Sequence, residues 1–278
     1  MTEAAWPVDL HSHSTCSDGA LSPEALLACA AGRGLRVLAL TDHDTMRGVR
    51  DAATAARAHG VSLVSGVEIS AWFEQEIHIL GYFLDPDHGP LTTALDLRAE
   101  RRRARVFEIA ALLAELGAPV DPDAILANAA QANVGRPHIA RALLAAGHVQ
   151  TMDEAFHRFL GRNGGAYVPA SRIPAGDAIA LIHDAGGAAV WAHPGVEGMD
   201  RSLPALAALG LDGLELRHPA HDATAVSRYA GLCGLWGLCP TGGSDYHGSE
   251  RPHLPGDFGI SEAGLAQLQA RAPRPYLL

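Results

Sequence analysis

Short apolar runs alternate with amphipathic segments in the first third of the chain. The runs at 37–40 (VLAL) and 61–70 (VSLVSGVEIS) have the length of buried strands, and 76–84 alternates like a strand. Segments 22–32 and 48–59 have helical spacing, and Ser22-Pro23-Glu24 is typical of a helix start. Strands separated by helices predict an α/β fold with a parallel sheet, open or closed, whose active groups lie at the carboxyl ends of strands.

The pattern changes between 91 and 166. Four segments there (91–117, 121–131, 136–147 and 151–161) have helical periodicity, with no strand-like run among them. The series of strands and helices resumes after 167, with strand-like runs ending near 193, 218 and 245. We therefore predict a barrel domain from 1–90 and 167–278, interrupted at 91–166 by a helical insertion that acts as a lid or specificity cap. About seven strands in all favour a small distorted barrel, although the pattern does not decide closure.

Composition excludes several classes of ligand and mechanism. The formal charge of −10 argues against duplex DNA or another polyanion binding over the whole surface, so a phosphate would bind in a local pocket. All 21 basic residues are arginine, which excludes a Schiff-base or P-loop lysine. The four cysteines form no CxxC pair, and no signal-like or membrane-spanning segment occurs. We expect a soluble cytoplasmic protein without a membrane partner; its oligomeric state stays open.

Histidines and carboxylates gather where apolar runs end. His11 and His13 are two residues apart, so an extended backbone directs both rings to one side. An isolated HxH motif often lies in a surface turn, but here similar histidine and carboxylate groups recur later in the chain, each at the end of an apolar run. The candidate metal ligands are His11, His13, Asp18, His43, Glu68, His78, His193, Asp245 and His247. Imidazole and carboxylate without thiolate suit Mn, Fe or Zn, and nine ligands exceed the needs of one ion. Clustered ions activate water and stabilise charge during displacement at phosphorus.

Five ordered motifs together resemble one family. They are HSHSTCSDG, TDHD, the GVE that precedes the strand with His78, AHPG and GSDYH, and they resemble the PHP (polymerase and histidinol phosphatase) family of metal-dependent phosphoesterases. The resemblance covers the chain outside the helical insertion. It implies a distorted (β/α)7 barrel with three metal ions, usually Mn2+, with Zn2+ or Fe2+ in relatives. The insertion after the histidine-bearing strand is most similar to nucleoside 3′,5′-bisphosphate phosphatases, whose relatives also trim short RNA from the 5′ end.

The resemblance also implies how the ligands divide among the metals. One ion would take His11, His13, Glu68 and Asp245, a second Asp18, His43 and His247, and a third Glu68, His78 and His193. Every ligand position of the family is filled.

Three residues beside the ligands are further candidates. We interpret Asp42 as a carboxylate that orients an imidazole, and Asp44 as the N-cap of the following helix. His218, at a strand end, is either structural or a catalytic group that contacts phosphate or protonates the leaving oxygen.

Arginines of the insertion are candidate substrate contacts. Asn133 and Arg136 precede a helix with an early proline, where backbone N–H groups also attract anions. Arg158 and Arg162 are four residues apart, so on one helical face they would form a second phosphate contact. The run from Arg101 to Arg105 is most simply the exposed face of a long helix, with RNA contact as the alternative.

The resulting hypothesis is a phosphatase acting on a small nucleotide, with short RNA as a second substrate. The preferred reaction removes the 3′-phosphate of a nucleoside 3′,5′-bisphosphate, a choice that rests on the resemblance. The alternatives are a histidinol phosphatase and a non-catalytic metal- or nucleotide-binding module.

Overall fold

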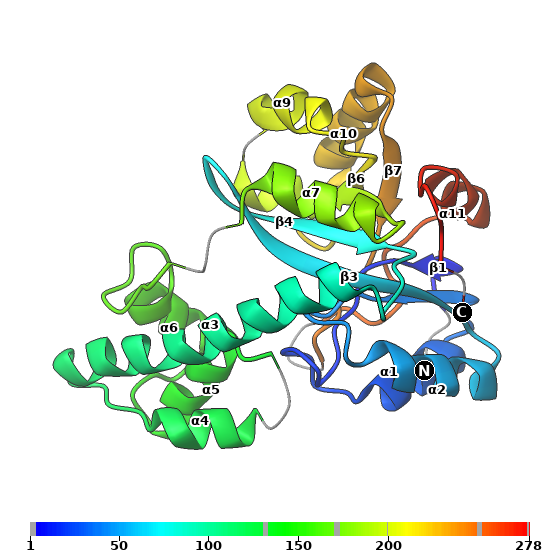
Figure 1. Cartoon of the computed structure of the whole chain (residues 1–278). Helices are drawn as coiled ribbons and strands as arrows, with labels where there is room; N and C mark the ends of the chain where they lie inside the picture. The colour runs from blue at the N-terminus through cyan, green and yellow to red at the C-terminus, as the bar shows by residue number, and fades with distance from the viewer. Residues whose placement is uncertain (1–3, 130–132, 170–172, 199, 249–251, 277) are drawn as a thin grey trace. The chain divides into compact units, whose positions relative to one another are not determined.

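The protein divides into two compact units. The computed structural model describes residues 4–129, 133–169, 173–198, 200–248, 252–276 and 278 (Figure 1). One unit comprises Met1–Ala94 and Arg172–Leu278, and the other comprises Leu95–Ser171. The second unit begins and ends a few residues later than the insertion expected at 91–166.

The first unit is built on a seven-stranded sheet in sequential order. Its strands are β1 (Val8–Asp9), β2 (Val37–Leu40), β3 (Ser62–Phe73), β4 (Gln75–Tyr82), β5 (Ala188–Trp191), β6 (Gly213–Arg217) and β7 (Cys239–Gly242). Beyond β1, the Leu10 N–H donates to Gly242 O, and Ser12 forms a parallel bridge with Tyr246. The first and last strands therefore nearly close the sheet, which confirms the predicted distorted (β/α)7 barrel.

One strand reverses the direction of the sheet. β4 pairs antiparallel with both β3 and β5, whereas every other pair of neighbours is parallel. Only Glu74, with φ of 56°, separates β3 from β4. A connection this short can only form a hairpin, because a parallel crossover needs a dozen or more residues.

Helices of the first unit cover the outside of the barrel. They are α1 (Pro23–Gly32), α2 (Val49–His59), α7 (Ala175–Asp184), α8 (Pro194–Glu197), α9 (Leu203–Ala208), α10 (Ala223–Trp236) and α11 (Glu262–Gln269), with a 3-10 turn at Asp200–Ser202. The Ser22 side chain accepts a hydrogen bond from the Ala25 N–H, as the predicted cap requires. α7 packs on β3, β4 and β5, and α10 packs on β6 and β7. These contacts hold the strand ends, and the side chains they carry, in fixed positions.

The second unit is entirely helical. It contains most of α3 (Gly89–Glu115), then α4 (Pro122–Asn128), α5 (Arg136–Ala145), α6 (Met152–Ala155) and a π-helical turn at Phe156–Leu160. Leu113, Leu143 and Leu160 are fully buried in its own core. Among the helices described in either unit, none combines the length and apolar character needed to cross a membrane.

Candidate metal centre

The nine predicted ligands converge within the barrel unit. His11 and His13 follow β1, His43 follows β2, and Glu68 and His78 lie on the β3–β4 hairpin. The remaining ligands are Asp18 in the first loop, His193 after β5, and Asp245 and His247 after β7. Together they form four overlapping clusters, in each of which the ligand atoms lie within 4.8 Å of one another: His13, Asp18, His43 and His247; His11, His13 and Asp245; His11, Glu68 and His193; His43, Glu68 and His78.

Glu68 lies at the middle of these clusters. Its Oε2 is 3.1 Å from His43 Nδ1 and 3.3 Å from the Nε2 atoms of His11 and His13. Its Oε1 is 2.7 Å from His78 Nδ1 and 3.0 Å from His193 Nε2. A single buried carboxylate therefore faces five imidazoles from four segments of the barrel.

Two further carboxylates extend the cluster to either side. Asp245 Oδ1 lies 3.4 Å from His11 Nε2 and 3.2 Å from His13 Nε2. Asp18 Oδ1 lies 3.3 Å from His247 Nε2. His13 thus belongs to the cluster of Asp18 as well as to that of Asp245, so the ligand sets overlap more than the three expected groups.

The donor atoms fit divalent cations. His11 Nε2, His13 Nε2 and Glu68 Oε2 are buried and make no hydrogen bond with any described residue. Buried polar atoms are nearly always satisfied, and a neutral imidazole directs a lone pair from its unprotonated nitrogen. Cations between these nitrogens and oxygens would satisfy all of them. An all-nitrogen and oxygen set suits Mn, Fe or Zn.

The surrounding charges favour the ionised carboxylates. Burial alone raises the pKa of Glu68, but His43, His78 and His11 outweigh it and hold that pKa well below its usual range. His43 behaves differently, since burial lowers its pKa to about 3. At neutral pH, Glu68 is therefore an anion and His43 is a neutral ligand.

Strained backbone conformations occur at the same place. Among the described residues, five other than glycine have positive φ, and three of these are Asp44 (48°), His193 (30°) and Asp245 (48°). Such conformations cost about 1–3 kcal/mol each and persist only where the surrounding structure enforces them. Two of the three are candidate ligands, so the fold imposes their positions.

The close packing of β7 on the segment after β1 can be tested at Gly243. A Cβ on Gly243 would lie 2.3 Å from the His11 backbone nitrogen and 2.4 Å from the His11 Cβ. We expect Gly243→Ala to displace His11, lowering stability by about 1–3 kcal/mol and reducing bound metal. Differential scanning calorimetry and metal analysis would measure both effects.

Gly231→Ala in α10 is the matched control, because a Cβ at Gly231 meets nothing within 4 Å. It should retain the metal content of the wild type and be at least as stable, because alanine is favoured over glycine inside a helix. Unchanged metal content in Gly243→Ala would show that His11 tolerates displacement.

Two buried acids beneath the centre received no role from the sequence. Asp9 Oδ1 accepts hydrogen bonds from the backbone N–H groups of His11 and Ser244, at 3.1 and 3.0 Å. Glu215 on β6 contacts His11 and His193. Both are acids within otherwise apolar strand-like runs, which is the signal that could have identified them.

The expectation for Asp42 was wrong. Its carboxylate accepts hydrogen bonds from the Ser14 N–H (2.8 Å), the Ser14 hydroxyl (2.7 Å) and the Ser17 hydroxyl (2.6 Å). No described imidazole is hydrogen-bonded to it. Asp42 therefore holds the loop that carries Asp18, because this loop folds back over the end of β2.

Asp44 was also misassigned. It is buried and its Oδ1 accepts a hydrogen bond from the Ser70 N–H on β3. The next helix, α2, begins at Val49 after Gly48, which provides no side-chain cap. Asp44 connects the end of β2 to β3 rather than capping a helix.

His218 lies beside the centre with a defined proton position. Its Nε2 is 3.3 Å from Asp245 Oδ2, and its Nδ1 accepts a hydrogen bond from the Ala220 N–H. Because Nδ1 is an acceptor, the neutral ring carries its proton on Nε2. His218 can therefore donate from Nε2.

The predicted arginine pair does not share a helical face. Arg158 lies in the π-helical turn, pairs with Glu154 and donates to His148 O. The helix ends at Leu160, because Gly161 adopts an extended backbone with φ of −72° and ψ of 170°. Arg162 follows this end in a turn, so the two guanidinium groups are not aligned by one helix.

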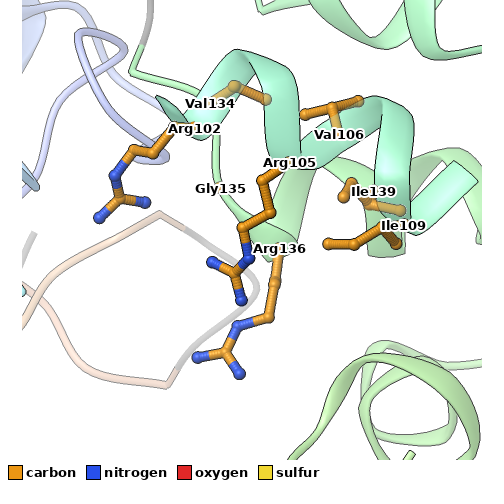
Figure 2. Close-up of a pocket in the computed structure, with 8 residues that line it drawn as sticks. All are labelled: Arg102, Arg105, Val106, Ile109, Val134, Gly135, Arg136 and Ile139. Carbon is orange, nitrogen blue, oxygen red and sulfur yellow. The ribbon is translucent and has the colours of Figure 1, made fainter. Parts of the chain in front are cut away.

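The other two predicted contacts lie at the start of α5. Asn133 is buried and Arg136 is the first residue of α5, with its Nη1 donating to Leu160 O at 3.4 Å. Arg136 also lines a small pocket with Arg102 and Arg105 of α3. Figure 2 shows the three side chains extending from α3 and α5 to the same side.

Arg105 departs from the expected exposed arginine run. It is only 8% exposed, and its Nε donates to Val168 O at 2.8 Å. Helical periodicity explains the difference, since Arg101 and Arg103 remain exposed while Arg105 is on the inner face with Val106. None of the residues that line the pocket is acidic.

Comparison with known proteins identifies relatives over almost the whole chain. The family described as PHP domain matches residues 9–106. The chain is 38% identical to a 5′-3′ exoribonuclease of Haemophilus influenzae, covering 86% of this chain and 89% of that protein. It is 34% identical to the 3′,5′-nucleoside bisphosphate phosphatase of Chromobacterium violaceum, covering 96% and 98%.

A solved structure agrees with these sequence matches. The metal-dependent phosphoesterase of Bifidobacterium adolescentis superimposes with a TM-score of 0.89 at 31% identity, covering 97% of this chain and 98% of that one. Similarity of this extent includes both the barrel and the helical unit. It follows that this chain is a member of the PHP family of metal-dependent phosphoesterases.

Proposed function

We propose that the protein hydrolyses the 3′-phosphate of nucleoside 3′,5′-bisphosphates and also acts on short 5′-phosphorylated RNA. The observation that carries the proposal is the buried Glu68 carboxylate, with five histidine nitrogens within 3.3 Å of its oxygens. The choice of substrate is supported by the relatives named as a bisphosphate phosphatase and an exoribonuclease.

In this proposal the nine clustered side chains hold three divalent ions, with Mn2+ as the first choice. Bound ions would supply an activated water and neutralise charge on the phosphoryl oxygens. The protein's own contribution is to fix the ligands: Glu68 and Asp245 are held as anions, and Asp42 and Asp44 hold the adjoining loops.

His218 would assist the leaving group. The Ala220 N–H donates to His218 Nδ1, so the neutral His218 ring carries its proton on Nε2. Asp245 lies 3.3 Å from that nitrogen. An imidazole oriented in this way can donate a hydrogen bond from Nε2 to the departing ribose oxygen, and the proton that this oxygen takes up would come from water. Asp245 orients the ring for this donation.

The helical unit would bind the 5′-phosphate. The pocket of Arg102, Arg105 and Arg136 collects guanidinium groups, which bind phosphate oxygens well, beside the N-terminus of α5. Asn133 adjoins this pocket through its neighbour Val134. Arg158 and Arg162 remain candidates for contacts with a longer RNA.

A phosphate-release assay tests the substrate assignment. The Mn-loaded protein should release phosphate from adenosine 3′,5′-bisphosphate at a higher kcat/KM than from adenosine 3′-monophosphate or histidinol phosphate. Short 5′-phosphorylated RNA should be shortened from its 5′ end. If the bisphosphate releases no phosphate while histidinol phosphate does, the alternative activity is correct.

A substitution at Arg136 tests the 5′-phosphate site. Because a charge-assisted hydrogen bond contributes about 1.5–3 kcal/mol, Arg136→Ala should lower kcat/KM for the bisphosphate by about 10- to 100-fold. The 3′-monophosphate should be cleaved as before, since it lacks the second phosphate. Exposed Arg103 on α3 provides the control, and Arg103→Ala should change neither rate. An equal loss on both substrates would place Arg136 outside the 5′-phosphate site.

A further inference from the structure

Glu215 accepts hydrogen bonds from two candidate metal ligands, His11 and His193. It is fully buried on β6, and its Oε1 accepts a hydrogen bond from His11 Nδ1 at 3.0 Å. Its other oxygen, Oε2, accepts the backbone N–H of His193 at 2.8 Å. The two histidine rings are stacked, with centroids 5.8 Å apart. One carboxylate thus supports ligands that follow two different strands, β1 and β5.

The contact with His11 determines which ring nitrogen is available. An ionised carboxylate only accepts hydrogen bonds, so His11 must carry a proton on Nδ1. A neutral His11 then directs its Nε2 lone pair toward Glu68 and Asp245, which lie 3.3 and 3.4 Å from that nitrogen. The other tautomer would place a proton where a cation has to bind.

The contact with His193 acts on the backbone. His193 has φ of 30° and ψ of 55°, a left-handed conformation that residues with a Cβ rarely adopt. By accepting the His193 N–H, Glu215 stabilises this conformation at the end of β5. The His193 ring then reaches Glu68, with Nε2 3.0 Å from Oε1.

We propose that Glu215 is a positioning residue for the metal centre: it fixes the tautomer of His11 and the backbone of His193 so that both rings can bind cations. The inference rests on the proposed metal centre. Carboxylates that orient metal-binding histidines are known to contribute 10- to 100-fold to metal affinity.

Glu215→Gln separates this role from simple packing. Glutamine has nearly the same size but only one acceptor oxygen, whereas two donors face residue 215. If its oxygen keeps the His193 N–H, its amide group faces His11 Nδ1 and favours the wrong tautomer. If its oxygen keeps His11, its amide faces the His193 N–H as a second donor.

The chain offers a matched control in Asp212. Its Oδ2 accepts hydrogen bonds from His183 Nε2 at 2.7 Å and from the Ala189 N–H at 2.8 Å, so it also joins an imidazole to a backbone amide. Neither His183 nor Asp212 belongs to the metal-binding clusters. Asp212→Asn therefore changes the same kind of contact away from the centre.

The experiment is a Mn2+ titration against a competing chelator, with the wild type and both variants in parallel. We expect Glu215→Gln to weaken metal binding by about 10- to 100-fold, and Asp212→Asn to bind as the wild type does. Glu215→Asp, which retains two acceptor oxygens, should recover part of the affinity. Equal affinity of Glu215→Gln and the wild type would overturn the inference, whereas failure of the wild type to bind metal would overturn the proposed function instead.

The metal-free wild type gives a second readout that does not depend on a variant folding. At a pH at which His11 is neutral, nitrogen-15 NMR of the imidazoles should show the ring proton on Nδ1. A neutral His11 protonated on Nε2 would overturn the inference even if Glu215→Gln cannot be purified.

Discussion

Replacing Glu68 by glutamine should lower kcat/KM for phosphate release by at least about 1000-fold. Glutamine keeps the size of the side chain but removes the charge and one of the two oxygens that face five histidines. Metal ions contribute several kcal/mol to transition-state stabilisation, and each 1.36 kcal/mol corresponds to a factor of ten in rate. Steady-state kinetics on the bisphosphate, with metal analysis of the same samples, would measure this loss.

Glu74→Gln is the control for that substitution. Glu74 occupies the exposed turn of the same β3–β4 hairpin, so the change removes a carboxylate without touching the centre. Its activity and metal content should equal those of the wild type. If Glu68→Gln retained full activity and a full complement of metal, Glu68 would not be needed to hold the ions, and the proposed role of this carboxylate would be wrong.

The sequence pattern was sufficient to predict the alternation of strands and helices and to select the nine clustered side chains, whereas the distorted barrel was expected from the resemblance to the family. The reason is physical: apolar runs of four or more residues must be buried, and polar groups that end such runs meet at one edge of a parallel sheet. His43 after VLAL and His193 after AAVW are clear cases, since their positions relative to the strand follow from the run itself. Convergence then follows from the fold.

Contacts made across the barrel could not be predicted in the same way. Glu215 and His11 are separated by 204 positions, and no local pattern indicates which strand lies beneath which ligand. Asp42 was assigned to an imidazole because of its neighbour His43, although its partners Ser14 and Ser17 are on the preceding loop. Such pairings depend on tertiary packing rather than on spacing along the chain.

Helix ends and helix faces were the other source of error. Arg158 and Arg162 have helical spacing, but Gly161, which lies between them, adopts an extended backbone and ends the helix at Leu160. Arg105 was counted with an exposed run, although only some positions of a helix can face solvent. Its place in the pocket with Arg102 and Arg136 emerges only when α3 and α5 are packed together.

The affinity of the metal-free protein for Mn2+ should rise by at least about tenfold per pH unit below pH 9. Burial lowers the pKa of His13, but the adjacent carboxylates of Asp245 and Glu68 outweigh burial and raise that pKa to about 9. Because a metal ligand must be deprotonated, binding at lower pH has to displace the His13 proton. Chelator-competition titrations at pH 7 and 8.5 would measure the change, and calorimetry in two buffers would count the protons released.

Loss of the His13 proton should make the metal-free protein less stable as pH rises. A pKa raised from its ordinary value of 6.5 to about 9 stabilises the folded chain fully below pH 6.5, and this contribution is lost as pH rises through 9. The metal-loaded protein lacks this dependence, because its ligands carry no such proton. The gain in Tm on adding Mn2+ should therefore increase between pH 6.5 and 9, and a gain that is constant over this range would mean that His13 does not compete for protons and metal.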